Sequence, residues 1–429
     1  MHSTSFDLSL EEISKIEGAA ALDLMVRDGK VVDLKLKITE FKRFYTQGIR
    51  GKNVADVPQL LARICGTCSN AHLLCSVESV EKALGITPSP QTMLMRRLTI
   101  SGLIIRDHGL HLYVFSLPDV VGKDSLLDFD ENDSREHELL HDTFIVKEAG
   151  NQLSIAFGGR SVHAPFVAVG GYTKFPKEEE LAITKEKLLK ARPAALRLID
   201  VFLNCPFRFE DETNFVGIKS ADYGFLTGDI ASTSGETIPE ANFREHLEHT
   251  VIPYSQASGY KFKGQPYMVG ALARLNLSKD HLHPKTRKDA DKALARFPSK
   301  NVYDNNLAQA IEILHCLDES VELLERNPKL VEEPLAQSGT SEGVGVGVIE
   351  APRGTLFHEL EIKDRKVVKA DIVVPTGQNQ VSMEKNVKTL VENNIGLGKE
   401  KLALEIEKLI RAYDPCMSCA THFLKVKWL

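Results

Sequence analysis

Residues 63–68 read Arg-Ile-Cys-Gly-Thr-Cys, and residues 414–419 read Asp-Pro-Cys-Met-Ser-Cys. Each stretch holds two cysteines separated by two residues, a spacing that lets both thiolates bind one metal atom. If the fold brings the two pairs together, they form a site with four thiolate ligands. Because the pairs stand near opposite ends of the sequence, such a site predicts a chain whose ends meet.

The composition is that of a globular protein. The chain has 429 residues, of which 43% are hydrophobic and 26% charged, and its formal net charge is −6. The absence of a basic block argues against nucleic acid as a partner. No apolar run reaches the length of about 18 residues that a membrane span needs, so we expect none. The first residues lack the pattern of a secretory signal, so we expect a cytoplasmic protein.

Three further cysteines stand apart from the two pairs. The chain has seven cysteines in all, and an odd number in a large intracellular chain argues against a disulfide framework. Cys75, Cys205 and Cys316 lie in apolar surroundings in the sequence. Because a free cysteine behaves as a small hydrophobic residue, we expect these three to be buried thiols.

The hydrophobic pattern predicts a chain that is mostly helical with β-hairpins. Residues 20–38 alternate around Arg27-Asp28-Gly29-Lys30, which indicates a hairpin, and residues 355–374 alternate in the same way around 363–366. Residues 205–262 are rich in Gly, Thr and aromatic residues and predict an irregular or β insertion. We predict helices over residues 54–84, 90–117, 134–156, 177–204, 285–295, 305–326, 379–394 and 400–413.

We therefore predict an α+β fold, a mostly helical single large domain with peripheral β-hairpins. The domain covers residues 1–429, with β-rich parts at 1–50 and 340–376. The first cysteine pair begins or interrupts a helix. The second pair follows the last helix closely, since Pro415 ends that helix.

The spacing of the cysteines alone leaves the metal open. Two such pairs are usual in structural zinc sites, but the pairs of a zinc ribbon lie roughly 15 to 20 residues apart. Thioredoxin-like redox chemistry needs one pair rather than two. An iron–sulfur cluster or another metal that prefers thiolates remains an alternative to zinc.

The residues around the cysteines carry a resemblance. The first pair has the form Arg-x-Cys-Gly-x-Cys with His72 behind it, and the second has the form Asp-Pro-Cys-x-x-Cys-x-x-His, ending at His422. The chain closely resembles the large, catalytic subunit of nickel–iron hydrogenases, in particular the cytosolic group linked to NAD(P) or sulfur reduction, which includes the sulfhydrogenase alpha subunits. Supporting segments are residues 16–18, 106–113, 158–163, 267–274, 305–309, 350–354 and 374–376.

This resemblance implies a specific metal centre and reaction. Cys65 and Cys416 would bind nickel alone, whereas Cys68 and Cys419 would bridge nickel to an iron that carries carbon monoxide and cyanide. The reaction would be the reversible heterolytic cleavage of dihydrogen to protons and electrons. Soft thiolate ligands suit a nickel ion that changes its redox state.

The resemblance offers two candidates for the base that takes the proton. One is Arg353, with Asp107 and Asp414 holding its guanidinium over nickel. Arginine is normally always protonated, so this role would be unusual. The other candidate is the thiolate of a cysteine in the second pair, either Cys416 or Cys419. This thiolate would pass its proton to Glu17, which would relay it outward.

Other matching residues would surround the cofactor. Arg353 and Thr376 stand where the family donates hydrogen bonds to the cyanides, and Pro352 belongs to the same cofactor-binding motif. His72 would hydrogen-bond a bridging cysteine sulfur. We expect four further polar residues to belong to internal polar networks: His108, His111, Arg160 and His163.

The sequence departs from the family pattern near its start. Residues 15–19 read Lys-Ile-Glu-Gly-Ala where the family usually has Arg-x-Glu-Gly-His, so Glu17 is kept. The family also has a second site for Mg²⁺ or Fe²⁺, for which His422 is the remaining ligand. Thr46 stands in place of the family's glutamate, and a hard cation prefers oxygen ligands. We expect this site to be empty, or water and another carboxylate to complete it.

The resemblance also implies partners. Family members lose the residues after the motif histidine once nickel is inserted, so we expect a maturation endopeptidase to remove residues 423–429. Electrons would leave through an iron–sulfur small subunit, and further subunits would carry flavin and a nicotinamide site. The alternatives are a hydrogenase-like subunit that has lost its metals and a zinc-stabilised structural protein.

Overall fold

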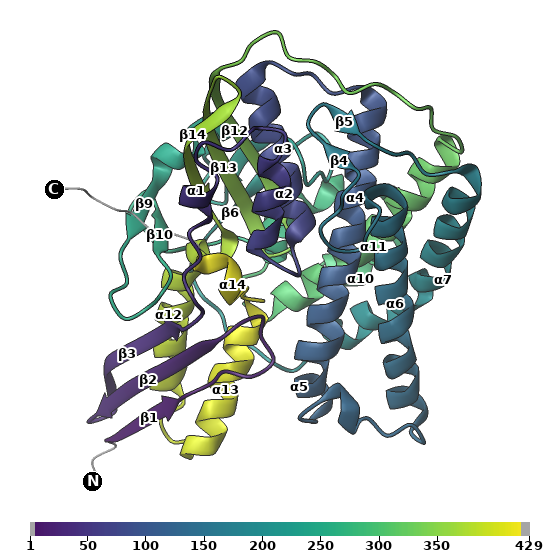
Figure 1. Cartoon of the computed structure of the whole chain (residues 1–429). Helices are drawn as coiled ribbons and strands as arrows, with labels where there is room; N and C mark the ends of the chain where they lie inside the picture. Colours follow the sequence, from purple (N-terminus) through teal and green to yellow (C-terminus); the bar gives the residue numbers. More distant parts are fainter. Residues whose placement is uncertain (1–4, 422–429) are drawn as a thin grey trace, which may run out of the picture.

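The computed structural model describes residues 5–421, and its helices form the body of the molecule (Figure 1). Helix α4 (Pro90–Leu110) packs against α6 (Ser134–Gly158) and α11 (Asp304–Arg326). Helix α7 (Glu178–Leu203) packs against α6 and α11 in turn. These long helices enclose most of the apolar core, and the predicted helical character of the chain is confirmed.

Local sequence signals explain where these helices begin. Pro90 stands in the first turn of α4, and the Ser89 hydroxyl accepts a hydrogen bond from Thr92 N at 3.0 Å. The Asp133 carboxylate caps α6 by accepting from Arg135 N and Glu136 N. Such side chains satisfy backbone donors that the first helical turn leaves without partners.

The cysteine pair interrupts the predicted helix 54–84, as expected. The structure has α2 (Val57–Leu61), a 3₁₀ turn (Ala62–Ile64), a non-helical loop through Cys65 and then α3 (Ser69–Leu84). The predicted helix 90–117 continues from α4 through a π-helical turn (His111–Ser116) into α5 (Leu117–Val121).

The remaining helices differ from the prediction mainly at their ends. The predicted helix 285–295 is divided into α9 (Pro284–Asp289) and α10 (Asp291–Leu294), because Ala290 leaves the helical conformation. Helix α12 (Pro375–Asn393) begins before residue 379, since proline is well tolerated in a first helical turn. Helix α13 (Lys399–Ala412) is close to its prediction, whereas three helices were not predicted: α1 (Tyr45–Gly48), α8 (Ala271–Ser278) and α14 (Met417–Ala420).

Small sheets lie around the helices. Strands β1 (Phe6–Leu10), β2 (Ala20–Arg27) and β3 (Lys30–Ile38) form one antiparallel sheet. Asp28 and Gly29 both have positive φ in the turn between β2 and β3, as a tight hairpin turn requires. The predicted hairpin 20–38 is therefore confirmed.

A second antiparallel sheet carries the later predicted hairpin. It consists of β12 (Gly343–Ala351), β13 (Gly354–Lys363) and β14 (Lys366–Val373), in that order. The β13–β14 turn at 364–365 is confirmed, and β12 is an additional strand. The shorter strands are β4 (Val167–Ala168), β5 (Gly171–Tyr172), β6 (Asn214–Lys219), β7 (Asp229–Ser232), β8 (Thr237–Ile238), β9 (Leu247–Thr250), β10 (Gly259–Phe262) and β11 (Tyr267–Met268).

No helix within residues 5–421 has the length and apolar character that crossing a bilayer demands. This agrees with the absence of a long apolar run in the sequence.

Helix α3 lies directly on β12 because alternate residues of that strand are glycines. A Cβ atom at Gly345 would overlap with the backbone of Ser79 and Ala83, and one at Gly347 would overlap with the backbone of Cys75. The packing of α3 against the sheet also fixes the position of Cys68, which directly precedes the helix. The glycines thus influence the geometry of the cysteine pair.

We predict that Gly345→Ala destabilises the protein by about 1–3 kcal/mol, the usual effect of overpacking a tight interface. Gly339→Ala is the matched control, since a Cβ atom there meets nothing within 4 Å. Denaturant-induced unfolding of the purified chain measures both. Equal unfolding midpoints for the two variants would contradict the tight α3–β12 contact.

Candidate metal centre

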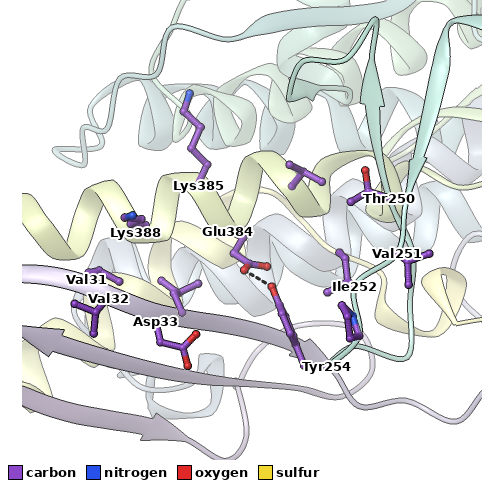
Figure 2. A pocket seen from close by; sticks show the side chains of 13 residues that line it. Val31, Val32, Asp33, Thr250, Val251, Ile252, Tyr254, Glu384, Lys385 and Lys388 are labelled. Atoms are coloured by element: carbon purple, nitrogen blue, oxygen red, sulfur yellow. Dashed lines mark hydrogen bonds between the residues drawn. The ribbon is translucent and has the colours of Figure 1, made fainter.

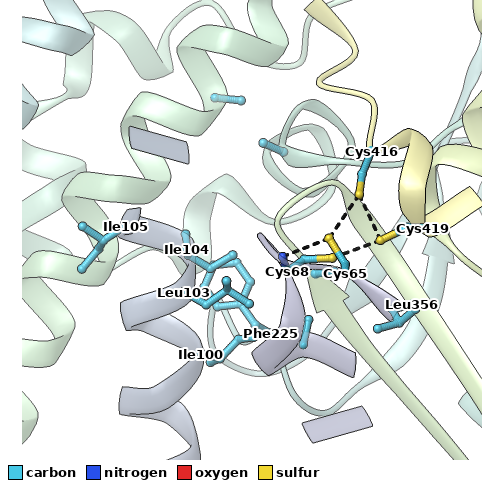
Figure 3. Packing of buried hydrophobic residues seen from close by; sticks show 14 of the residues in the cluster. Cys65, Cys68, Ile100, Leu103, Ile104, Ile105, Phe225, Leu356, Cys416 and Cys419 are labelled. Atoms are coloured by element: carbon cyan, nitrogen blue, oxygen red, sulfur yellow. Dashed lines mark hydrogen bonds between the residues drawn. The ribbon is translucent and has the colours of Figure 1, made fainter. Parts of the chain in front are cut away.

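The four paired cysteines meet at one buried place (Figure 3). The Sγ atoms of Cys65 and Cys416 are 3.4 Å apart, and those of Cys68 and Cys419 are 3.2 Å apart. Cys416 Sγ is 3.0 Å from Cys419 Sγ, and all four sulfurs lie within 4.8 Å of one another. Sulfurs this close converge on a shared volume of the size that a small metal centre occupies.

The first pair is positioned by the break between the 3₁₀ turn and α3. Cys65 is extended, with φ −138° and ψ 144°, and Cys68 is the N-cap residue of α3. Arg106 on α4 donates a hydrogen bond from Nη2 to the Thr67 carbonyl oxygen at 2.5 Å. The loop from Cys65 to Cys68 is therefore fixed by the 3₁₀ turn before it, by α3 after it and by Arg106 in its middle.

The second pair follows a sharp turn after α13. Asp414 has a φ of +51°, and Pro415 prevents the helix from continuing. Cys416 then pairs with Glu17 in an isolated parallel bridge, in which Met417 N donates to the Glu17 carbonyl oxygen at 2.9 Å. The beginning and the end of the chain meet here, as the cysteine spacing predicts.

Gly18 permits this close approach. Its φ is +81°, and a Cβ atom there would lie 2.9 Å from the Met417 Cβ and 3.1 Å from the Ser418 N. Only glycine combines the positive φ with the small volume that this contact requires.

The Thr376 side chain holds the backbone of the second pair. Its Oγ1 accepts a hydrogen bond from Cys416 N at 2.8 Å, and the side chain is buried. Thr376 lies in the first turn of α12, so the N-terminus of this helix points toward the cysteines. The hydroxyl hydrogen of Thr376 remains available as a donor.

Arg353 is fixed by two buried carboxylates. It stands in the turn between β12 and β13, where its Nη1 is 2.8 Å from Asp107 Oδ2 and its Nη2 is 3.0 Å from Asp414 Oδ1. Burial alone would lower the pKa of Arg353, but the two carboxylates outweigh it and raise the pKa well above its usual value. Gln309 also donates to Asp414 Oδ2 at 2.9 Å, which orients the second carboxylate.

Pro352 anchors the same turn through its backbone. The Pro352 carbonyl oxygen accepts a hydrogen bond from Arg274 Nη2 at 3.0 Å. Arg274 is itself paired with Glu312 and Glu350 in the interior, at 2.6 and 2.7 Å. A buried ionic network therefore supports the residue that precedes Arg353.

Glu17 lies beside a terminal cysteine. Its Oε2 is 3.0 Å from Cys416 Sγ, and its Oε1 accepts a hydrogen bond from Ser418 Oγ at 2.5 Å. Burial raises the pKa of Glu17, and the negative charge of Cys65 raises it further. The raised pKa increases the fraction of this carboxyl that is protonated at neutral pH.

His72 connects a second cysteine to the interior. Its Nε2 lies 3.6 Å from Cys419 Sγ, and its Nδ1 lies 3.1 Å from His358 Nε2 on β13. Burial lowers the pKa of His72 to about 4, so the ring is neutral. The sequence did not reveal His358 or Ser418 as site residues, because His358 stands in no motif and Ser418 occupies a variable position between the two cysteines of the second pair.

Of the four residues expected in internal polar networks, His108 and His111 lie in them, whereas His163 is half-buried and Arg160 is exposed, so the expectation for Arg160 was wrong. His108 Nε2 is 2.8 Å from Glu312 Oε2, and His111 Nδ1 is 2.6 Å from Gln309 Oε1, so both belong to buried networks. Thr46 is buried on α1. His422, expected to bind the second cation, lies outside the described residues.

A surface pocket of about 440 Å³ lies elsewhere, between β3, α12 and residues 250–254 (Figure 2). Tyr254 donates a hydrogen bond to Glu384 there, and burial raises the pKa of the Glu384 carboxyl. No cysteine lines this pocket. It is therefore separate from the metal centre.

The donor set fits a soft metal cation. Burial raises the pKa of Cys416 and of Cys419 well above the usual range, while hydrogen bonding from Cys416 lowers that of Cys65 well below it. Four buried sulfurs thus cannot all carry a negative charge unless a cation balances them. Nickel, iron or zinc would supply that charge, so burial alone does not select among them.

Comparison with protein families decides between these metals. Residues 46–142 and 218–422 match the family described as nickel-dependent hydrogenase. The chain belongs to this family. The nickel-dependent hydrogenase resemblance expected from the cysteine motifs is confirmed, and so is the assignment of the chain as a catalytic hydrogenase subunit.

Curated relatives match the hydrogenase along its whole length. It is 34% identical to sulfhydrogenase 2 subunit alpha of Pyrococcus furiosus, covering 98% of this chain and 100% of the relative. It is 28% identical to the NAD-reducing hydrogenase HoxS subunit beta of Cupriavidus necator, covering 97% and 95% of the two chains.

Solved structures share the fold. A chain of an NAD⁺-reducing [NiFe]-hydrogenase in its H₂-reduced state matches with a TM-score of 0.87 and 25% identity, over 97% of this chain and 99% of that chain. The Ni-Fe-Se hydrogenase of Desulfovibrio vulgaris Hildenborough matches with a TM-score of 0.77 and 22% identity, over 97% and 100%. The predicted fold class is confirmed.

We predict that Thr376→Val lowers the unfolding free energy by about 1–3 kcal/mol, because it leaves the buried Cys416 N–H without its acceptor. Thr376→Ser keeps the hydroxyl and should lose much less. Urea unfolding of the metal-free chain provides the measurement. If valine and serine variants are equally stable, the hydrogen bond does not hold this segment.

Proposed function

We propose that this hydrogenase subunit holds a nickel–iron centre in which Cys65 and Cys416 bind nickel alone while Cys68 and Cys419 bridge nickel to iron. The convergence of four buried sulfurs within 4.8 Å is the observation that carries this proposal. When bound, the centre supplies the Lewis acidity and redox capacity for reversible heterolytic cleavage of dihydrogen, with carbon monoxide and cyanide on the iron.

Glu17 is the proposed proton carrier. The Cys416 thiol donates to Glu17 Oε2 across 3.0 Å, a distance suited to proton transfer. Burial raises the pKa of this carboxyl, which favours its protonated form. Ser418 donates to the other oxygen and so fixes the orientation of the carboxyl.

Arg353 is better suited to donate hydrogen bonds than to act as the base that takes a proton. Its pKa is raised well above the usual value by Asp107 and Asp414, so releasing a proton is harder than in water. This favours the Cys416–Glu17 route over arginine as the base. Two carboxylates bind Nη1 and Nη2, whereas the buried Nε has no hydrogen-bond partner among residues 5–421.

The free donors suit negatively charged iron ligands. We assign Arg353 Nε and the Thr376 hydroxyl hydrogen to the cyanides, with Pro352 placing the arginine through its turn. His72 donates to or accepts from the Cys419 sulfur and adjusts its basicity. In each case the residue stabilises charge on a ligand rather than taking part in bond cleavage.

Electrons require a partner subunit. Cys75, Cys205 and Cys316 are buried singly, and the four paired cysteines are the only group of three or more clustered metal-ligating side chains within residues 5–421. We propose an iron–sulfur small subunit as the direct partner. We further propose flavin and NAD(P) or sulfur-reducing subunits, acting in the cytoplasm. The names of the two relatives, a sulfhydrogenase subunit and an NAD-reducing hydrogenase subunit, support the sulfur and NAD part of this proposal.

Two parts of the proposal concern the C-terminal residues: their removal by a peptidase and the second cation site. We propose that an endopeptidase removes residues 423–429, which lie outside the described residues, as does His422. A second Mg²⁺ or Fe²⁺ site is not formed by the described residues alone, since Thr46 offers no carboxylate.

Metal analysis with an infrared spectrum tests the centre directly. Protein from a host with the maturation machinery should contain nickel and iron in equal amounts and show carbon monoxide and cyanide stretches. Cys65→Ser should lose nickel, because a hydroxyl binds soft metals poorly. Cys75→Ser is the control, since Cys75 lies outside the four-sulfur group. Zinc alone in the fully matured parent would overturn the proposal.

We predict that Glu17→Gln lowers hydrogen turnover by about 10²–10⁴-fold, since an amide cannot relay the proton. Nickel, iron and the infrared bands should stay at parent levels, which separates proton transfer from assembly. Glu12→Gln is the matched control, because Glu12 is exposed on the same segment. Parent-like turnover in the Glu17→Gln variant would require another proton route.

A further inference from the structure

Two histidines stand one helical turn apart on the exposed side of α6. The imidazole centroids of His137 and His141 lie 4.3 Å apart, with their planes inclined by 52°. Both side chains are exposed, and Phe144 continues the same side at 64% exposure. By contrast, Leu139 and Asp142 are buried on the side that faces neighbouring helices. The two imidazoles therefore share one open patch of surface.

The helix holds this pair in a suitable geometry. Residues four positions apart lie on the same side of a helix, with Cβ atoms roughly 5–6 Å apart. The Asp133 cap binds Arg135 N and Glu136 N at 3.0 and 2.9 Å, so the turn that carries His137 is firmly formed. A transition metal binds imidazole nitrogen at about 2.0–2.1 Å, so the rings need only small side-chain rotations to chelate one ion.

We propose that His137 and His141 form a binding site for one divalent transition cation of the zinc, copper and nickel class. One nitrogen of each ring binds the ion, and water completes its coordination. Imidazole suits these metals, whereas Mg²⁺ and Ca²⁺ prefer oxygen ligands. The site lies on a different element from every cysteine of the catalytic centre and does not depend on the proposed function of that centre.

The site is not that of a metalloprotease, although residues 137–141 read His-Glu-Leu-Leu-His. That motif supplies two zinc ligands and a general base, and a catalytic zinc site also needs a third protein ligand. Glu138 is 3.3 Å from Arg197 Nε in an ion pair. In the part of the chain that the structure describes, the four cysteines are the only set of three or more clustered ligands. Two ligands make an exchangeable binding site without hydrolytic chemistry.

Zinc uptake by the mature enzyme complex tests the proposal, because zinc is absent from the proposed catalytic centre. The complex is dialysed against increasing Zn²⁺, and bound zinc is counted per large subunit. We expect one zinc that His137→Gln and His141→Gln each remove, with the apparent Kd rising at least about tenfold. Hydrogen turnover before zinc addition should equal that of the parent in both variants.

His246→Gln is the matched control, because it removes a half-buried histidine that has no histidine four positions away. It should keep the zinc. Equal zinc uptake by the parent and the His137→Gln variant would overturn the proposal, as would the absence of any bound zinc below roughly 0.1 mM. Coverage of α6 by a partner subunit would also give no uptake and would equally refute a site in the assembled enzyme.

Discussion

The contact between Glu17 and Cys416 is the interaction on which the rest of this structure depends. It joins residues 399 positions apart through a backbone bridge and a side-chain hydrogen bond. Closing so long a loop costs only slightly more than closing a shorter one, since the entropy grows with the logarithm of length. The contact places the last cysteine pair beside the first and puts a carboxyl next to one of the four clustered thiols. The contact that joins the two ends of the chain is therefore also the contact that completes the group of four sulfurs.

Buried charge is the main difficulty of such a centre. Four thiolates together with the carboxylates of Asp107 and Asp414 would be strongly unfavourable in the interior if nothing balanced them. Arg353 balances the two carboxylates directly, and the metal ions would balance the sulfurs. The hydrogenase thus couples metal insertion to stability, because the thiolate form of the site and the bound cation stabilise each other.

Sequence patterns captured the long helices and the cysteines more completely than the surroundings of the site. Helices such as α6 and α11 have long periodic segments, and the two hairpins have turn residues with positive φ, so local rules suffice for them. Short α8 and the division at Ala290 depend on packing that no local pattern encodes. The family resemblance, rather than any local pattern, singled out Glu17 and Arg353 as candidate site residues, since their separate positions in the sequence give no sign that they belong to one site.

His358 and Ser418 show why the remaining site residues escaped sequence analysis. His358 stands on β13 between Phe357 and Glu359, and only the packing of α3 on the sheet brings it to 3.1 Å from His72. Ser418 lies inside the second cysteine motif, but its role depends on the arrival of Glu17 from the other end of the chain. Contacts of this kind arise from tertiary structure, so a single sequence cannot reveal them without the fold.

Two long helices add a further electrostatic contribution to the centre. Cys68 occupies the N-cap position of α3, and the hydroxyl of Thr376 in the first turn of α12 accepts from the backbone N–H of Cys416, so both helices begin beside the cysteines. The partial positive charge at a helix N-terminus favours nearby anions. One helix comes from the early part of the chain and the other from the late part. When the two ends of the chain meet, they therefore bring together the positive N-termini of two helices as well as two pairs of cysteines. Neither cysteine pair would have both helix N-termini nearby without the other.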